Sequence, residues 1–259
     1  MRTLLLCLVL SASAAFAAGS PRVLLLWDVK NEQTEALAKS LRTSGADVVF
    51  SATAGPQFNG ENPPLEGFDV VVHLNGTTYA EEMNFAGQRS LKEFVARGGG
   101  YVHHEWNAYA LSIGHYMGLR ELILFDRTSG FGPGEVVVKK VPTKEQQHPV
   151  IWEIPQSFTM KGASNIGHAH VFKEYPVQVL AVDQNGNDAI AVRELRLGRI
   201  VGFHHSGNWN GMTLLDSGEA RRLFVDGVRW AWGCDPNMLA KDEPRAKKCA
   251  EIQTSRVRR

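Results

Sequence analysis

Short apolar runs alternate with segments of helical periodicity along the first half of the chain. Compact runs rich in valine and leucine predict buried strands at residues 23–27, 47–50 and 70–72. Apolar side chains recur every three or four residues over 31–44 and 81–97, which predicts two amphipathic helices. Alternation of strands and helices favours a parallel sheet covered on both faces. We therefore expect an α/β fold with a three-layer, doubly wound, mainly parallel sheet.

The second half of the chain predicts an antiparallel extension of this sheet. Apolar runs predict strands at residues 135–141, 177–182, 189–194 and 199–203. Asn185-Gly186-Asn187 separates the second of these runs from the third and is typical of a hairpin turn. A hairpin joins neighbouring strands in opposite directions, so these strands should extend the parallel sheet as an antiparallel edge.

Three further segments complete the expected elements. Residues 108–117 have helical spacing, whereas residues 148–160 are interpreted as a connecting excursion because a proline interrupts them. Residues 217–232 form an amphipathic pattern that predicts a helix with Ser217 as its N-cap and Gly233 at its end.

Polar side chains crowd the end of a strand that follows three consecutive glycines. Gly98-Gly99-Gly100 predicts a helix stop followed by a buried strand, because glycine permits positive φ angles and close backbone approach. His103, His104 and Glu105 then fall at the exit of that strand. Ligand sites of open α/β sheets lie beyond the carboxyl ends of their strands. This exit is therefore the candidate active or binding site.

The two ends of the chain differ from the middle. Residues 1–17 contain one arginine, an apolar run and Ala15-Phe16-Ala17, which is the pattern of a cleaved secretory signal peptide. We expect one domain over residues 18–235, a basic tail over 236–259, and a secreted or periplasmic protein. Cys234 and Cys249 would both remain after cleavage, and the sequence leaves open whether they form a disulfide.

The charge balance argues against nucleic acid or a membrane surface as partner. The formal net charge is +1 for the whole chain, and removal of Arg2 with the signal peptide brings it to 0. A neutral protein has no overall field that would attract polyanions. The apolar run of the signal peptide is too short to cross a bilayer, so we expect no membrane anchor. The expected partner is a small molecule bound at a local site, and the oligomeric state is unknown.

Histidine clustering is the strongest chemical signal of the sequence. Six of the nine histidines occur in the three groups His103-His104, His168-x-His170 and His204-His205. Histidine is the commonest metal ligand, so a zinc-like divalent ion held by His104, His168, His170 and His205 is one hypothesis. The alternative is a hydrogen-bonded polar crevice without metal, because neighbouring residues of a strand face opposite sides.

Other residues at the strand exits could bind or convert a ligand. Glu105 could act with His104 and His205 as a general acid and base, or be a solvated loop glutamate. Trp106 and Trp209 could stack on a sugar ring or belong to the core. Asp28 and Asn75 could bind ligand hydroxyls or merely cap turns. The remaining candidates for substrate binding are Tyr79, Asn107 and Asn208.

Taken together, these motifs resemble the ThuA-like family, the trehalose-utilisation branch of the class I glutamine-amidotransferase-like fold. The resemblance rests on the helix-glycine-strand segment 91–102, on His148-Pro149-Val150, on Gly198-Arg199-Ile200, and on residues 221–233 with Trp230. It implies a flavodoxin-like sheet in which the strands at 100 and 199 are neighbours, so that His104, His205 and one of His168 or His170 could meet.

The resemblance also implies a carbohydrate-related function. In amidotransferases the corresponding strand-to-helix elbow carries a nucleophilic cysteine, whereas both cysteines here follow the last helix. Cysteine-dependent glutamine hydrolysis is therefore not expected. Acid-base or metal-assisted chemistry on a sugar is one possibility, and a non-catalytic ligand-binding or assembly module is the other.

Overall fold

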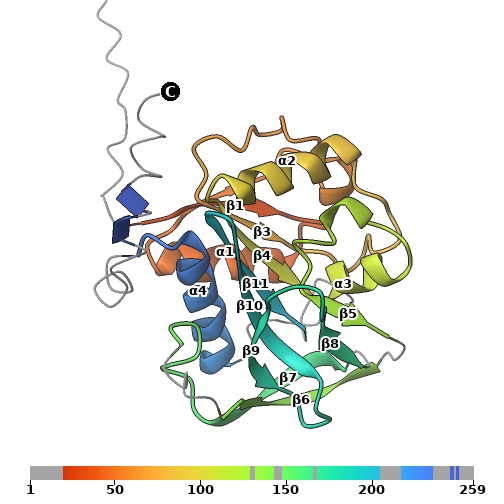
Figure 1. The fold of residues 1–259 in the computed structure, drawn as a ribbon, viewed down its shortest axis with the longest axis vertical. Helices are drawn as coiled ribbons and strands as arrows, with labels where there is room; N and C mark the ends of the chain where they lie inside the picture. The colour runs from red at the N-terminus through yellow and green to blue at the C-terminus, as the bar shows by residue number, and fades with distance from the viewer. Residues whose placement is uncertain are drawn as a thin grey trace, which may run out of the picture.

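The computed structural model describes residues 20–128, 132–142, 148–165, 168–204, 217–235, 246–247 and 249–250. These residues form a nine-stranded sheet and a separate two-stranded ribbon (Figure 1). The strands of the large sheet are β1 (Arg22–Leu26), β2 (Asp47–Phe50), β3 (Val70–His73), β4 (Gly100–His104), β6 (Gly132–Lys140), β7 (Ser157–Asn165), β9 (Gln178–Val182), β10 (Asp188–Leu195) and β11 (Gly198–Phe203). The ribbon pairs β5 (Phe125–Arg127) with β8 (Ala169–Val171).

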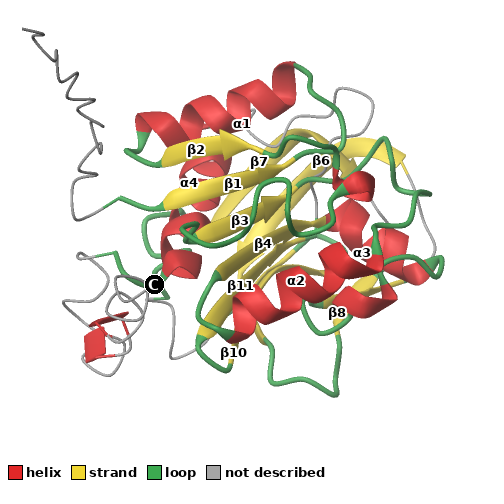
Figure 2. Cartoon of the chain, turned by 90° about the horizontal axis from the view of Figure 1, so that it is seen from above, coloured by secondary structure: helices red, strands yellow, loops and turns green. Residues whose placement is uncertain are grey.

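Helices connect the strands and cover the sheet. They are α1 (Glu32–Thr43), α2 (Phe85–Ala96), α3 (Glu105–Ser112) and α4 (Gly218–Trp232), with short 3-10 helices η1 (Gly55–Gln57) and η2 (Met117–Leu119). Figure 2 shows α1 and α4 on one face of the sheet and α2 and α3 on the other. The expected three-layer α/β architecture is confirmed.

Half of the large sheet is parallel. Its order is β2-β1-β3-β4-β11-β10-β9-β6-β7, and the pairings from β2 to β11 all run in the same direction. Alternate side chains of each buried strand enter different hydrophobic clusters. Val23 and Leu25 pack on the α1 and α4 side, whereas Leu24 and Leu26 pack on the α2 side. Strands that are covered on both faces consist of continuous apolar runs, so these strands could be predicted from the sequence.

The other half of the sheet is antiparallel. The predicted hairpin joins β9 to β10, which pairs with β11 on its other side. The expected strand at 135–141 corresponds to β6. Two features were not predicted. Strand β7 covers residues 157–165 and so overlaps the segment 148–160 that was expected to be a connection without a strand. The β5–β8 ribbon forms a second, separate sheet.

The last helix packs closely on the site strand, and a glycine allows the approach. A Cβ atom added to Gly100 would lie 2.6 Å from the backbone C and O of Ala231 in α4. The side chain of Ser217 accepts a hydrogen bond from the amide of Ala220, and Gly233 ends the helix in the left-handed conformation, as predicted. Helix α4 therefore lies directly behind β4.

The start of the C-terminal tail is tied to the domain. Cys234 and Cys249 form a disulfide with their Cα atoms 5.4 Å apart, and both are almost fully buried. The rest of the tail and the expected signal peptide lie outside the described residues.

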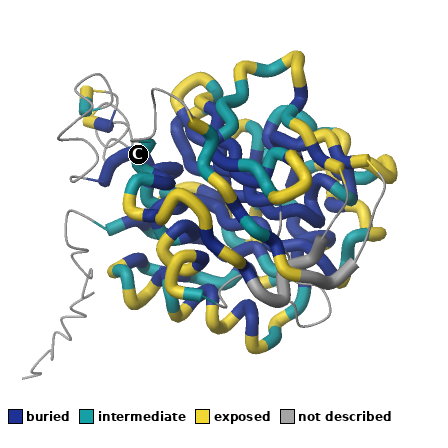
Figure 3. Tube along the Cα trace, turned by 90° about the horizontal axis from the view of Figure 1, so that it is seen from below, coloured by how far each residue is buried: buried dark blue, intermediate teal, exposed yellow. Residues whose placement is uncertain are grey.

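Figure 3 shows that burial is concentrated along the strands and the inner helix faces. None of the described helices has the length and hydropathy needed to cross a membrane.

Candidate functional site

The candidate site is the elbow between β4 and α3. Strand β4 ends at His104, and α3 begins at the next residue, Glu105, rather than at residue 108 as expected. The side-chain Oδ1 of Asn107 accepts a hydrogen bond from the backbone amide of His104 at 3.0 Å. A hydrogen bond from the N-cap amide back to the side chain of the third helical residue is part of a capping box. It fixes the direction of the chain at the turn. The elbow therefore projects Glu105 from the first position of a helix.

Glu105 forms a buried ion pair with Arg127 of β5. The Nε atom of Arg127 lies 2.8 Å from Oε1 of Glu105, and the two side chains are 3% and 0% exposed. Burial raises the pKa of Glu105 from 4.5 to about 8, although the positive charge of Arg127 lowers it. A carboxyl group of this kind can be protonated near neutral pH, and Arg127 stabilises the carboxylate that remains when the proton leaves.

Three aromatic rings lie next to this pair. Trp106 is 3% exposed, and its ring centroid is 5.3 Å from that of Tyr79 and 5.2 Å from that of Tyr109. The guanidinium carbon of Arg127 lies 4.3 Å from the centre of the Tyr109 ring. Tyr79 and Tyr109 are only partly buried, so the aromatic group that contacts Arg127 through Tyr109 reaches the protein surface. We refer to Glu105, Arg127, Tyr79, Trp106 and Tyr109 as the elbow cluster.

The paired histidines of β4 face opposite sides of the sheet. His103 packs on Phe125 at a ring separation of 5.7 Å, and its Nε2 accepts a hydrogen bond from the amide of Leu124. The ring of His104 lies instead against Phe203 and, on the α4 side, Phe224. Burial lowers the pKa of His103 to about 4, so its ring is neutral at physiological pH. His103 therefore has a structural role in the core.

A second buried histidine connects β3 to the elbow. Asn107 directs its Nδ2 toward Nδ1 of His73 at 3.1 Å, and the hydroxyl of Tyr101 lies 2.7 Å from the same nitrogen. An amide that donates to Nδ1 requires this nitrogen to be unprotonated, which places the proton on Nε2. Burial lowers the pKa of His73 to about 3. Asn107 was predicted to bind substrate, but both polar atoms of its side-chain amide form hydrogen bonds within the protein.

Asp28 and Asn75 hold the loops at the strand ends. Oδ2 of Asp28 accepts a hydrogen bond from the amide of Thr77 at 2.8 Å. Asn75 accepts from the amide of Gly76 and donates to the carbonyl of Trp106 at 3.3 Å. Both side chains are buried, and these contacts correspond to the capping alternative considered for them. They position the loop that carries Tyr79.

The structure does not bring His104 together with His168 or His170. In the β5–β8 ribbon Arg127 pairs with Ala169 on the buried face, whereas Asp126 pairs with His170 on the other face. His168 and His170 are exposed, and Nδ1 of His170 lies 3.6 Å from Oδ2 of Asp188. Among the residues that the structure describes, no group of three histidine, cysteine, aspartate or glutamate side chains could hold a metal ion.

Three predicted site residues, His205, Asn208 and Trp209, lie outside the described residues. The neighbouring His204 is 3% exposed and its ring is 5.1 Å from that of Phe125. As expected, β11 lies beside β4, with Phe203 opposite His104.

Two members of the elbow cluster, Arg127 and Tyr109, were not predicted from the sequence. The only local signal for Arg127 was its position just after the short apolar stretch from Leu122 to Phe125.

Comparison with known proteins relates the chain to others by structure. No protein-family model and no curated protein matches the sequence. A solved ThuA-like protein of Parabacteroides merdae is 17% identical and superposes with a TM-score of 0.60 over 82% of this chain and 90% of its own. A ThuA-like protein of Bacteroides uniformis is 16% identical, with a TM-score of 0.59 over 87% and 97% of the two chains.

An amidotransferase-type protein also matches. A solved protein of Thermoplasma acidophilum, described as a component of GMP synthase, is 10% identical, with a TM-score of 0.53 over 86% of this chain and 98% of its own. At these identities the similarity concerns the fold, which agrees with the parallel half-sheet and the β4–α3 elbow. The chain therefore shares its fold with these ThuA-like and GMP synthase-type proteins.

Proposed function

We propose that this protein is exported and binds a carbohydrate at the elbow cluster, where Glu105 supplies acid-base chemistry. The observation that carries the proposal is a buried carboxyl of raised pKa, paired with Arg127, at the strand-to-helix elbow. Strand exits of open α/β sheets are the usual ligand sites, and a carboxyl with a pKa near the working pH is suited to proton transfer.

The aromatic rings support a sugar as the ligand class. Tyr79 and Tyr109 present partly exposed rings beside the buried Trp106. Flat amphipathic rings suit the apolar face of a pyranose while their hydroxyls bond to water or ligand. The resemblance to proteins of trehalose utilisation points to the same class. A small polyhydroxylated molecule also fits a chain whose formal net charge is only +1, and neither nucleic acid nor a membrane is proposed as partner.

The secreted or periplasmic location belongs to the proposal. It rests on the signal-peptide pattern of residues 1–17 and is supported by the Cys234–Cys249 disulfide. Disulfides persist in oxidising compartments and are rare in the cytosol.

A non-catalytic ligand-binding role is the second candidate, and one observation favours it. Glu105 is fully buried, so a ligand meets Tyr79 and Tyr109 first and reaches the carboxyl only after covering side chains move. A protein that merely binds would need no such movement. Turnover therefore separates the two candidates.

The test is a thermal-shift screen of disaccharides, including trehalose, and their oxidised derivatives. A ligand present at about one hundred times its dissociation constant stabilises the protein by about 2.7 kcal/mol. The Tyr79→Ala variant should lose the response, whereas Tyr175→Ala, which removes another partly buried tyrosine away from the elbow cluster, should keep it. No response to any sugar, or equal loss in both variants, contradicts the proposal. If binding is found, turnover that Glu105→Gln abolishes supports the enzyme, and binding without turnover supports the non-catalytic role.

A further inference from the structure

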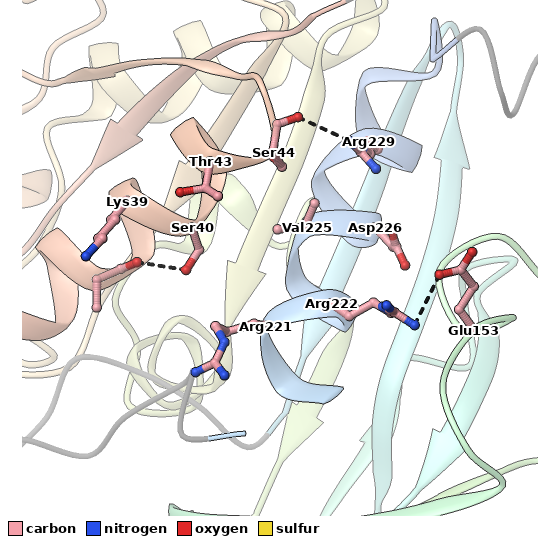
Figure 4. A pocket seen from close by; sticks show the side chains of 11 residues that line it. Lys39, Ser40, Thr43, Ser44, Glu153, Arg221, Arg222, Val225, Asp226 and Arg229 are labelled. Carbon is pink, nitrogen blue, oxygen red and sulfur yellow. Dashed lines mark hydrogen bonds and ion pairs between the residues drawn. The ribbon is translucent and has the colours of Figure 1, made fainter. Parts of the chain in front are cut away.

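A groove of about 640 Å³ separates α1 from α4 on the helix layer, apart from the elbow cluster (Figure 4). Small residues of α1, including Ala36 and Ser40, line one side, and residues 221–229 of α4 line the other. Known small-molecule pockets span about 300 to 1,000 Å³, so a compact ligand would fit. The groove shares no residue with the elbow cluster, so it is a separate candidate site.

Positive charge dominates the lining. Lys39 of α1 and Arg221, Arg222 and Arg229 of α4 line the groove together with two carboxyl groups, those of Glu153 and Asp226. Two of the arginines are held in place. Nη1 of Arg222 lies 3.2 Å from Oε2 of Glu153, and Nη2 of Arg229 donates to the carbonyl of Ser44 at 3.1 Å (Figure 4). Fixed guanidinium groups lose less freedom when they bind an oxyanion.

Asp226 is the unusual member of the lining. It is 9% exposed, and within the described part of the chain its carboxyl has neither a hydrogen-bond partner nor an ion pair. Burial raises its pKa from 3.8 to about 6. The nearby Arg229 and Arg222 lower it, and Glu153 and Asp235 raise it. A carboxyl that is neutral below this pH can donate a hydrogen bond into the groove instead of repelling an anion.

We propose that the groove binds a small molecule through a doubly charged tetrahedral oxyanion, such as a phosphate or sulfate group. Guanidinium groups match the geometry of such oxyanions, and Lys39 and Arg221 add charge from the two opposing helices. The proposal depends on this groove alone and stands whether or not the elbow cluster binds a sugar.

Isothermal titration with sodium sulfate tests it, with sodium chloride keeping the ionic strength constant. Sulfate remains divalent over the useful pH range, so any pH effect comes from the protein. Arg221→Gln and Lys39→Gln should each weaken sulfate binding by about two- to fivefold, the effect of one exposed ion pair. Arg97→Gln, which removes an exposed arginine that pairs with Glu93 from the end of α2, should leave it unchanged. Absence of sulfate binding, or the same affinity in all three variants and the wild type, overturns the proposal.

The pH dependence provides a second readout that does not depend on the arginines. Sulfate should bind more tightly at about pH 5 than at about pH 8, because the carboxylate of Asp226 repels it once ionised. The dependence should disappear in Asp226→Asn, which keeps the shape and cannot ionise. An Asp226→Asn variant with the wild-type pH dependence would contradict the role given to this residue.

Glucose 6-phosphate and glucose, titrated in parallel, show whether a phosphate ester binds more tightly than free sulfate. Binding of glucose but not of glucose 6-phosphate would contradict the proposal that the ligand carries an oxyanion.

Discussion

At the scale of single residues, the proposed acid-base chemistry depends on the pKa of Glu105. Burial disfavours the carboxylate and Arg127 favours it, and burial is the larger effect, so the pKa rises to about 8. Arg127 also stacks on Tyr109, which lets the guanidinium remain buried beside a neutral carboxyl group. The pair thus changes from a neutral acid next to a cation into a full ion pair as pH rises.

Replacing Arg127 by methionine should therefore cost more stability at high pH than at low pH. Above about pH 8 the wild-type pair is charged, whereas the variant must either keep Glu105 protonated against the pH or bury an unpaired carboxylate. Loss of one partner of a buried pair costs about 3 to 5 kcal/mol. At about pH 6 Glu105 is mostly protonated, and methionine can replace part of the packing on Tyr109, so the cost should be smaller. Denaturant unfolding at both pH values measures the difference.

Arg120→Met is the matched control for this comparison. Arg120 pairs with Glu174 at 2.7 Å and lies 4.2 Å from the centre of the Phe172 ring, but both charged side chains are about half exposed. Exposed pairs contribute about 0 to 1 kcal/mol. Its substitution should cost little and equally at both pH values. If Arg127→Met shows the same small and constant cost, the buried pair does not behave as described.

At the scale of elements, the parallel strands and the amphipathic helices could be predicted from the sequence. Val70 to Val72 are buried on both faces of the sheet and therefore form a continuous apolar run. Helix α4 has apolar residues at helical spacing between an N-cap and a terminal glycine. Both patterns can be recognised from the local sequence alone. Strand β7 could not be predicted, because Pro155 and scattered polar residues precede and interrupt its pattern. The β5 and β8 strands have three residues each, too few for an alternating pattern to show.

The contact between β4 and α4 leads to a prediction about Gly100. Alanine at this position would place its Cβ 2.6 Å from the backbone of Ala231, so α4 must move outward. Overpacking of this kind costs about 1 to 3 kcal/mol. Gly218→Ala is the control, because a Cβ there meets nothing within 4 Å at the exposed start of α4. Calorimetric melting should show a clear loss for Gly100→Ala only, and equal melting temperatures for the two variants would contradict the packing described.

At the scale of the whole molecule, the strand exit that carries the candidate site could be predicted from the sequence, but not all of the side chains that meet there. Glycines followed by His103, His104 and Glu105 identified the strand exit, and parallel topology places such exits together. Arg127 completes the site from a ribbon far along the chain, and no local pattern links it to Glu105. Asp28, Asn75 and Asn107 were correctly placed near the strand ends, but their hydrogen bonds go to the protein itself. Contacts of that kind depend on loop geometry, which the sequence pattern does not contain.

The raised pKa of Glu105 also has a consequence for the stability of the whole protein. A carboxyl whose pKa is raised on folding contributes stability that is complete below its unfolded pKa, here 4.5. That contribution is lost as pH rises toward about 8, because ionisation is easier in the unfolded chain. Glu105 thus opposes folding increasingly between these two values. The native protein retains this carboxyl at a cost in stability, which is common for groups that serve a site.

The central claim is that the elbow carries a carboxyl group poised for proton transfer, and ¹³C NMR titration of the Glu105 side-chain carboxyl tests it most directly. Glu105→Gln lacks the resonance and so assigns it. The account predicts a midpoint near pH 8, shifted higher in Arg127→Met because the neighbouring cation is gone. A midpoint at or below the ordinary value of 4.5 would show that Glu105 is a permanently charged partner of Arg127, and the acid-base role would be contradicted.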